Sequence, residues 1–358
     1  MSEAPKGLAL RHVVLMHRHG DRSPITARVS PTLYMDEAER SYWTSQLPSP
    51  EVFAALDAAA TVVSESEAKQ GGAWPNGQLT QRGVDGMFAR GQAIRAQYKD
   101  FLAGATPDDV YIVSTNITRT IRSAQSVVRG LFPEPAPFKV HTMAPQYLTP
   151  VHSNAEYMAF GIHANEVAQA TRPGYATLEA QMKDILGLGA DEDVHWTIVR
   201  EVLVCRKAHG LPMPEGLTDE LYAAACDQNA WEWHLLYSDP DKAQRGFVRG
   251  LLEIQTHLQS AVQTAISHRM TIISAHDNTI VALACALGLE MGHVVPDYGA
   301  ILAFELYEDT ATHESYVLVR FEGNAIKFAQ QAQPLVPYKY VEGVLERFFA
   351  THATASAL

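Results

Sequence analysis

The sequence predicts an α/β protein with a mixed, mostly parallel central sheet flanked by helices and a mostly helical cap inserted into it. Short continuous apolar runs alternate with amphipathic helical patterns, which is typical of a parallel sheet covered by helices. Near the C-terminus two apolar runs flank a short polar segment, which adds an antiparallel pair. Residues 34–78 and 150–245 break the alternation and are predicted to form the cap.

Three apolar runs are predicted to be the buried strands of the sheet. They are "HVVLM" (12–16), "VYIVST" (110–115) and "MTIIS" (270–274). Continuous apolar runs of this length are expected where helices cover both faces of a strand. The hairpin is predicted from "ILAFELY" and "SYVLVRF", which flank the polar segment "EDTATHE".

Apolar residues at helical spacing predict the helices that cover the sheet. These stripes extend over 84–102, 117–131 and 251–266, and a final helix is expected over 341–349. The chain therefore divides into an α/β core made of 7–33, 79–149 and 246–350, and a cap made of the insertions 34–78 and 150–245.

Composition excludes several classes of partner. The 358-residue chain carries a net charge of −12, which repels nucleic acid and anionic lipid. Its three cysteines form no C-x-x-C pair, so neither a disulfide framework nor a thiolate zinc site is expected. The oligomeric state is not indicated by any pattern.

No segment of the sequence has the pattern of a leader or a membrane anchor. The first eleven residues contain no apolar signal-peptide region, and the most apolar later stretch, "TIVALACALGL", is too short to span a bilayer. A cytoplasmic protein without an integral membrane segment is expected, or a mature form from which a leader has been removed.

Each predicted core strand ends in a cluster of chemically reactive residues. The clusters are "RHGDRSP" after the first strand, "STNITR" at the end of the second and "SAHDN" at the end of the third. Alone, each is typical of a solvated loop or a structural histidine. In an open α/β sheet, however, ligands bind beyond the carboxyl ends of the strands. The three clusters are therefore expected to converge on one site.

The charges in these clusters predict a site for a phosphate. Arg18, Arg22 and Arg119 would bring three fixed positive charges together, and guanidinium groups match phosphate oxygens in a bidentate manner. Arg119 would also lie in the first turn of a helix, where the backbone amides favour an anion. The expected partner is a small phosphorylated molecule.

His19 is the candidate nucleophile of this site. Neighbouring arginines oppose protonation of its imidazole and keep it in the attacking form. Attack on a phosphate ester would give a phosphohistidine, with the arginines stabilising the charge on the phosphoryl oxygens. Asp277 would protonate the leaving group if its pKa is raised or the medium is acidic. This chemistry needs no metal and no other cofactor.

A metal-dependent hydrolase is an alternative interpretation of the same stretch. His17, His19 and Asp21 form an H-x-H-x-D pattern, and two histidines at i and i+2 of a strand can chelate a metal. Arg22 stands where a further histidine is wanted, and the arginines would repel a divalent ion. A non-catalytic phosphoanion-binding protein and a phosphotransferase or mutase are the other function classes.

Several other residues are explained by structural roles. Thr80 is expected to cap a helix in "GQLTQRG". His141 follows another strand and would border the pocket or pack. Trp231 and Trp233 are expected to serve core packing more than to line the cap.

At these residues the chain resembles the histidine acid phosphatase family, branch 2 of the histidine phosphatase superfamily. "RHGDRSP" is similar to the R-H-G-x-R-x-P motif of that family, and "SAHDNTI" to its H-D element. The resemblance continues through "WPNGQLTQRG", "YIVSTNITRTIRSAQ" and "VPDYGAILAFELY", and fades over 150–245.

The resemblance implies a phosphoglycerate-mutase-like core, a helical cap and acid phosphatase activity. It implies that His19 is the nucleophile and Asp277 the proton donor, and that the phosphate-binding group is Arg18, Arg22, Arg119 and His276. The "STNI" segment is also similar to the lysophosphatidic-acid phosphatase subgroup, which suggests a lysophospholipid phosphate as substrate. Unlike secreted members, the chain has no cysteines near its C-terminus, and its sequon at Asn116 would lie beside the phosphate pocket.

Overall fold

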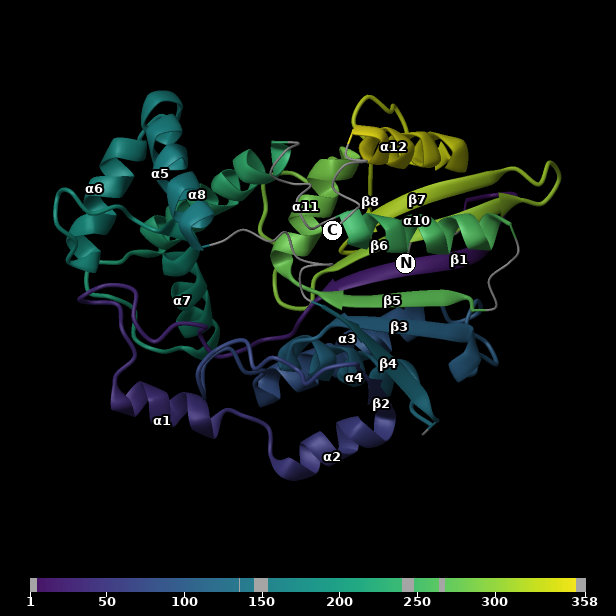
Figure 1. The fold of residues 1–358 in the computed structure, drawn as a ribbon, viewed down its shortest axis with the longest axis horizontal. Helices are drawn as coiled ribbons and strands as arrows, with labels where there is room; N and C mark the ends of the chain where they lie inside the picture. The colour runs from purple at the N-terminus through teal and green to yellow at the C-terminus, as the bar shows by residue number, and fades with distance from the viewer. Residues whose placement is uncertain (1–4, 135, 145–153, 240–247, 264–267, 352–358) are drawn as a thin grey trace.

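A single sheet organises the molecule in the computed structural model, which describes residues 5–134, 136–144, 154–239, 248–263 and 268–351 (Figure 1). The strand order is β2-β4-β3-β5-β1-β6-β7-β8, with β9 paired to β7. The strands from β2 to β1 are parallel, and β6 begins an antiparallel part. The strands are β1 (Leu8–Arg18), β2 (Ala60–Val63), β3 (Val110–Thr115), β4 (Phe138–Met143), β5 (Met270–Ala275), β6 (Ile301–Asp309), β7 (Ser315–Phe321), β8 (Asn324–Ile326) and β9 (Leu335–Pro337).

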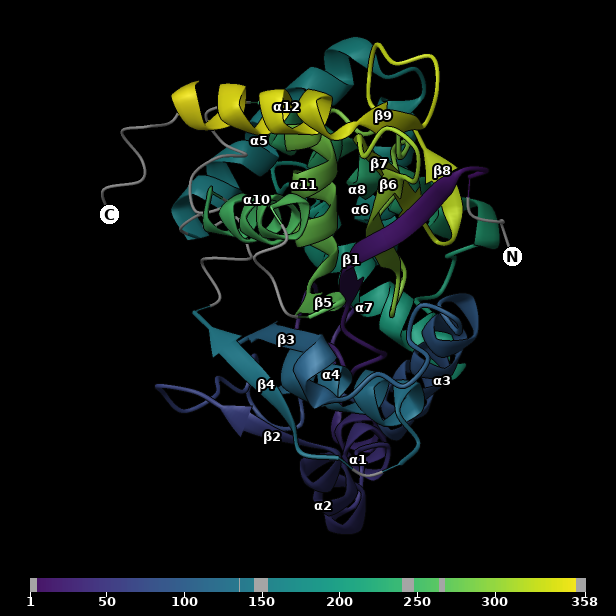
Figure 2. The same ribbon diagram turned by 90° about the vertical axis from the view of Figure 1, so that its right-hand side faces the viewer.

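Helices cover both faces of the sheet, as the apolar runs predict (Figures 1 and 2). Alternate residues of β1 point to opposite faces, because the side chains of a strand alternate. Val14 and Met16 pack with one set of helices, whereas Val13 and Leu15 pack with the other. The first set is α10 (Val248–Val262), α11 (Asp277–Leu287) and α12 (Tyr338–Thr351), and the second is α3 (Gln81–Gln97) and α4 (Thr118–Leu131).

The predicted strands, hairpin and helices are confirmed, with shifts at their ends. The stripe predicted to continue to residue 102 leaves the helix after Gln97, and Tyr98 and Leu102 enter the core from the turn that follows. The stripe predicted over 251–266 is helical to Val262, and residues 264–267 lie outside the described residues. A short 3-10 helix, η1 (Pro107–Asp109), leads into β3.

A second group of helices packs around an apolar core of its own beside the sheet (Figure 1). Trp196, Met182 and Leu203 are fully buried in this core. The helices are α5 (Asn154–Thr171), α6 (Tyr175–Leu186), α7 (Trp196–His209) and α8 (Asp219–Ser238). They fall within the stretch 150–245 for which a cap is predicted; residues 150–153 and 240–245 lie outside the described part of the chain.

The stretch 34–78 differs from the expected insertion. It forms α1 (Glu37–Ser45) and α2 (Pro50–Ala59), but then contributes β2, which pairs in parallel with β4 at the edge of the sheet. The β-branched residues of "ATVV" explain the strand. The division into core and cap stays a prediction. In this division β2, a strand of the sheet, falls within the insertion 34–78.

Across the described ranges, no helix combines the length and the apolar character needed to cross a bilayer. Cys205, Cys226 and Cys285 are all free thiols.

Candidate active site

The three reactive clusters converge because their strands are neighbours. β3, β5 and β1 are consecutive and parallel in the sheet, so their carboxyl ends meet at one edge. A pocket of about 260 Å³ opens there. All six residues predicted for the site line it: Arg18, His19, Arg22, Arg119, His276 and Asp277.

His19 follows the last residue of β1 and is 2% exposed. Its Nδ1 lies 2.8 Å from the carbonyl oxygen of Gly20. A carbonyl only accepts, so Nδ1 carries the proton and Nε2 holds the lone pair. Burial first, and then Arg119, Arg18 and Arg22, hold the pKa of His19 well below its usual value. The imidazole is therefore neutral, with Nε2 as its basic nitrogen.

Close backbone packing fixes the loop that carries His19. A Cβ at Gly20 would lie 2.7 Å from the carbonyl oxygen of Gly83 on α3, so only glycine fits this position. The first turn of α3 is held by Thr80, whose side chain accepts a hydrogen bond from the Gly83 amide at 3.0 Å. The predicted cap at Thr80 is thus confirmed.

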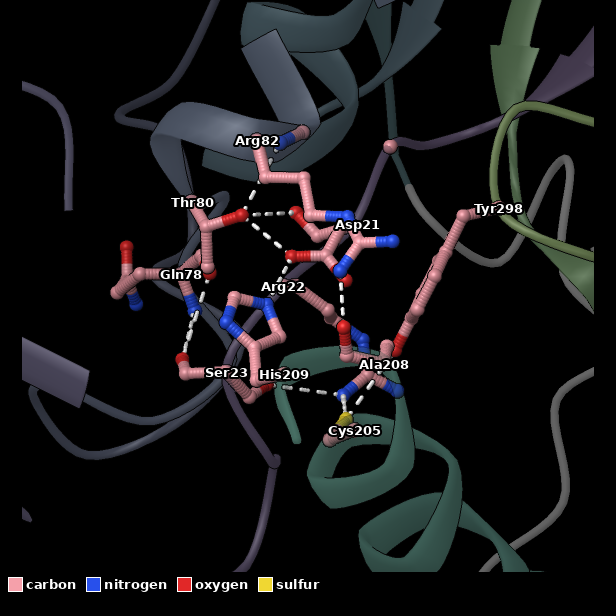
Figure 3. A network of polar contacts seen from close by, with 12 residues as sticks. Asp21, Arg22, Ser23, Gln78, Thr80, Arg82, Cys205, Ala208, His209 and Tyr298 are labelled. Carbon is pink, nitrogen blue, oxygen red and sulfur yellow. Dashed lines mark hydrogen bonds and ion pairs between the residues drawn. The ribbon is translucent and has the colours of Figure 1, made fainter. Parts of the chain in front are cut away.

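Asp21 belongs to a supporting network and not to the pocket lining (Figure 3). Its carboxylate accepts from the Thr80 hydroxyl at 2.5 Å and lies 2.7 Å from Nε2 of His209 at the end of α7. His17 is fully buried in β1, and its Nδ1 donates to the Arg18 carbonyl at 3.0 Å. The metal interpretation of His17, His19 and Asp21 is therefore not supported, because these side chains are directed to different partners.

Two of the arginines are held by carboxylates. Arg18 pairs with Asp277 at 2.7 Å, donates to the Pro296 carbonyl at 2.6 Å and lies over the ring of Tyr298. Arg22 pairs with Glu201 of α7. It also donates to the Ser23 carbonyl (Figure 3). Both guanidinium groups are thus positioned before any ligand binds.

Arg119 has no such carboxylate among the described residues. It lies in the first turn of α4 and is 7% exposed. Its Nε and Nη1 are buried without a hydrogen-bond partner, as are the Nε atoms of Arg18 and Arg22. Burial and the neighbouring Arg22 lower the pKa of Arg119 to about 9. Buried N–H groups without partners are costly, so this arrangement is suited to an anion that supplies the missing acceptors.

His276 and Asp277 begin α11 directly after β5. The His276 ring lies 5.6 Å from that of His19, and its Nε2 is 3.1 Å from the Thr115 hydroxyl. Burial first, then Arg119, holds the pKa of His276 well below its usual value. Burial alone would raise the pKa of Asp277, but Arg18, Arg200 and Arg22 outweigh it, and the net shift is downward. The raised pKa that would favour proton donation by Asp277 is therefore not found in the structure.

Three further residues that the sequence does not predict line the pocket: Arg200 and Glu201 of α7, and Tyr298 in the segment before β6. Trp233 of α8, for which core packing is predicted, lines it too. Among the described lining residues, four guanidinium groups against the carboxylates of Glu201 and Asp277 leave a charge of +2 when the histidines are neutral. The adjacent Arg-Glu pair at the end of "WTIVRE" was the available signal, but such pairs are common on exposed helix faces.

Packing and hydrogen bonding explain the positions of the remaining candidate residues. His141 stacks on Tyr111 with ring centroids 5.2 Å apart and does not line the pocket. Trp231 packs against the core of the second helix group, whereas Trp233 also borders the pocket. Asn116 of the sequon is 5% exposed, and its amide donates to Ser66 at 2.8 Å. A glycan on this nitrogen would require the loop to open.

The geometry agrees with a family model. The model, described as the histidine phosphatase superfamily (branch 2), matches residues 9–181 and 239–322. The chain belongs to this superfamily. Every residue of the predicted site lies within the matched ranges, whereas Arg200 and Glu201 of the phosphatase lie between them.

Named relatives agree with this assignment. The phosphatase is 30% identical to the testicular acid phosphatase of Homo sapiens over 84% of its own length and 68% of the relative. It is 24% identical to the lysophosphatidic acid phosphatase type 6 of Bos taurus over 88% and 78% of the two chains. A Hafnia alvei phytase in complex with tartrate shares the fold, with a TM-score of 0.66 and 17% identity over 96% of this chain and 98% of that one.

Proposed function

We propose that this protein is an acid phosphatase that hydrolyses phosphate monoesters, without a metal ion, through a phosphohistidine on Nε2 of His19. One observation carries the proposal: a neutral, buried imidazole lies among guanidinium groups whose buried N–H donors lack acceptors. The phosphoryl oxygens of a substrate would supply those acceptors and bring phosphorus to the imidazole.

The reaction needs two steps in which bonds and protons balance. The Nε2 lone pair forms a bond to phosphorus while the ester P–O bond breaks, and Asp277 gives its proton to the leaving oxygen. Water then attacks phosphorus and returns a proton to Asp277 as the N–P bond breaks, which releases inorganic phosphate. Arg18, Arg22 and Arg119 stabilise the charge on the phosphoryl oxygens in both steps.

The proton on Asp277 is explained by the ligand. In the free site Arg18 holds the pKa of Asp277 down at a distance of 2.7 Å. A bound phosphate ester places negative charge beside both groups, which opposes the arginines and raises the pKa of Asp277 again. Acid pH also favours a protonated Asp277, because the substrate then binds as a monoanion and carries the proton that Asp277 requires. Turnover is therefore expected to be best at acid pH.

The test is turnover of p-nitrophenyl phosphate by the His19→Ala variant, with His163→Ala as the control because His163 lies on an exposed helix face. His19→Ala should abolish turnover with the fold intact, and vanadate but not EDTA should inhibit the unmodified protein. Loss of activity to EDTA, restored by zinc or manganese, would support the metal alternative. Binding of p-nitrophenyl phosphate without release of nitrophenol would support a binding protein instead.

We propose that the substrates are phosphate esters with an apolar chain, such as a lysophosphatidate. A second cavity of about 480 Å³ shares Thr197 and Trp233 with the phosphate pocket. Its walls are mainly apolar, and Glu232 is the carboxyl that lines it among the described residues. Burial raises the pKa of Glu232 to about 8. The similarity to a relative named as a lysophosphatidic acid phosphatase supports the same class.

A series of 1-acyl glycerol phosphates tests this substrate class. The value of kcat/KM should rise with chain length by up to about fourfold per methylene, as expected for burial of apolar surface. Ile198→Asn, at an exposed wall of the second cavity, should remove that dependence and leave p-nitrophenyl phosphate turnover unchanged. Equal kcat/KM values for short and long chains would reject the apolar chain but not the phosphatase.

A further inference from the structure

Three histidines from three elements meet beside the N-terminal half of β1, away from the pocket. His12 belongs to β1, His257 to α10, and His268 lies two residues before the start of β5. One ring nitrogen of each lies within 4.8 Å of those of the other two. His12 is seven residues before His19, which corresponds to roughly 20 Å along an extended strand. This cluster is therefore separate from the phosphate site.

The spacing of these rings fits metal ligation. Nδ1 of His257 lies 3.3 Å from Nε2 of His268. Two nitrogens that bind one tetrahedral zinc ion at about 2.0–2.1 Å are about 3.3–3.4 Å apart. The other nitrogen of His257, Nε2, lies 3.6 Å from the carboxylate of Glu253. A histidine ligand commonly donates its second nitrogen to a carboxylate in this way.

The protonation state of these histidine rings also favours a metal ion. His12 is fully buried, its Nε2 lies 3.2 Å from the Thr271 hydroxyl, and its Nδ1 has no hydrogen-bond partner. Burial and the neighbouring histidines lower the pKa of His12 to about 3, and burial and His257 lower that of His268 to about 4. Neutral imidazoles offer lone pairs, which is the form that binds a metal.

We propose that His12, His257 and His268 bind a divalent transition-metal ion, of which zinc is the expected one. Imidazole ligands suit zinc and its neighbours, whereas calcium and magnesium require oxygen. Three protein ligands leave a fourth position for water. The ion would connect α10 to β1 and to the start of β5, so its role is to stabilise the fold and not to take part in phosphoryl transfer.

The test uses the full chain, stripped of metal by a chelator and then titrated with zinc by calorimetry. One zinc ion should bind per chain, and at a concentration about a hundredfold above Kd it should raise Tm by about 4 °C. Cobalt should give the visible absorption of a tetrahedral site. His268→Gln, at a half-buried position, should lose this binding and the shift in Tm while it keeps p-nitrophenyl phosphate turnover.

The matched control is the double variant His234→Gln/His293→Gln. These rings stack at 4.7 Å, and His234 lies near Cys285, but they do not belong to the converging cluster. The control should bind zinc like the unmodified protein. Absence of stoichiometric binding, binding that survives His268→Gln, or binding lost in the control would each overturn the proposal. None of these outcomes bears on the role of His19.

Discussion

The chemistry of the site depends on the protonation of a few buried side chains. His19 stays neutral because burial and three arginines oppose a further positive charge, and its tautomer is set by the carbonyl of Gly20. Arg18, which lies 2.7 Å from Asp277, is the main group that holds the pKa of this carboxyl below its usual value. The proposed nucleophile and the proposed proton donor are thus controlled by the same guanidinium groups, and a bound phosphate would change the balance for both.

Replacement of the proton donor should separate substrates by their leaving groups. Asp277→Asn should lower kcat for alkyl phosphates by about 10²–10⁴-fold, because an alkoxide must be protonated as it leaves. The loss for p-nitrophenyl phosphate should be far smaller, because nitrophenolate is a stable leaving group. Steady-state kinetics on both substrates measures the difference, and equal losses would show that Asp277 does not donate the proton.

Helix α7 completes the pocket from outside the sheet. It supplies Glu201, which pairs with Arg22, and Arg200, which adds a positive charge to the lining. Cys205, one turn after Glu201, contacts Arg22 and the hydroxyl of Tyr298 (Figure 3). The proposed phosphate site is thus built by strand ends on one side and by this helix on the other.

Removal of the positive charge of Arg200 on α7 should weaken the binding of an anion in the pocket. Arg200→Gln should raise the inhibition constant of inorganic phosphate roughly tenfold, the loss expected for one charged hydrogen bond. It should also raise the pKa of Asp277, because Arg200 is one of the groups that lower it. Arg172→Gln is the control, since Arg172 pairs with Asp227 away from the pocket. An unchanged inhibition constant would show that Arg200 does not contact phosphate.

At the scale of the molecule, the strands that form the site were predictable because fully buried parallel strands are continuous apolar runs. The convergence of their reactive ends was predictable too, because parallel strands share a carboxyl edge. Two features of the structure were not predictable from the sequence. The short edge strand β2 has only four residues and reads as an extension of a helix-compatible stretch. The contribution of α7 depends on how distant helices pack against the sheet, which no local pattern encodes.

The buried histidines also make the stability of the whole molecule depend on pH. The folded-state pKa values of these groups are lowered, so below about pH 6.5 the unfolded chain binds protons that the folded chain does not. Stability is therefore full above that pH and declines as the pH falls, by about 1.4 kcal/mol per group at pH 5.5. Among the described residues, the most buried of these groups are His12, His17, His19 and His276.

Urea unfolding of the metal-free protein from pH 7.5 to 5.0 measures this effect. The free energy of unfolding should fall steadily below pH 6.5, and inorganic phosphate should restore part of it by binding only the folded state. A free energy that is flat or increases across this range would show that the buried imidazoles are not held neutral.

The central claim is that phosphorus is transferred to Nε2 of His19, and a trapped intermediate tests it most directly. The protein would be mixed rapidly with labelled substrate, quenched in alkali, in which phosphohistidine survives, and mapped by peptide mass spectrometry. The account predicts a phosphoryl group on His19 that forms within one turnover and is lost in acid. A phosphoryl group on any other residue, or product formed with no phosphoenzyme at all, would contradict it.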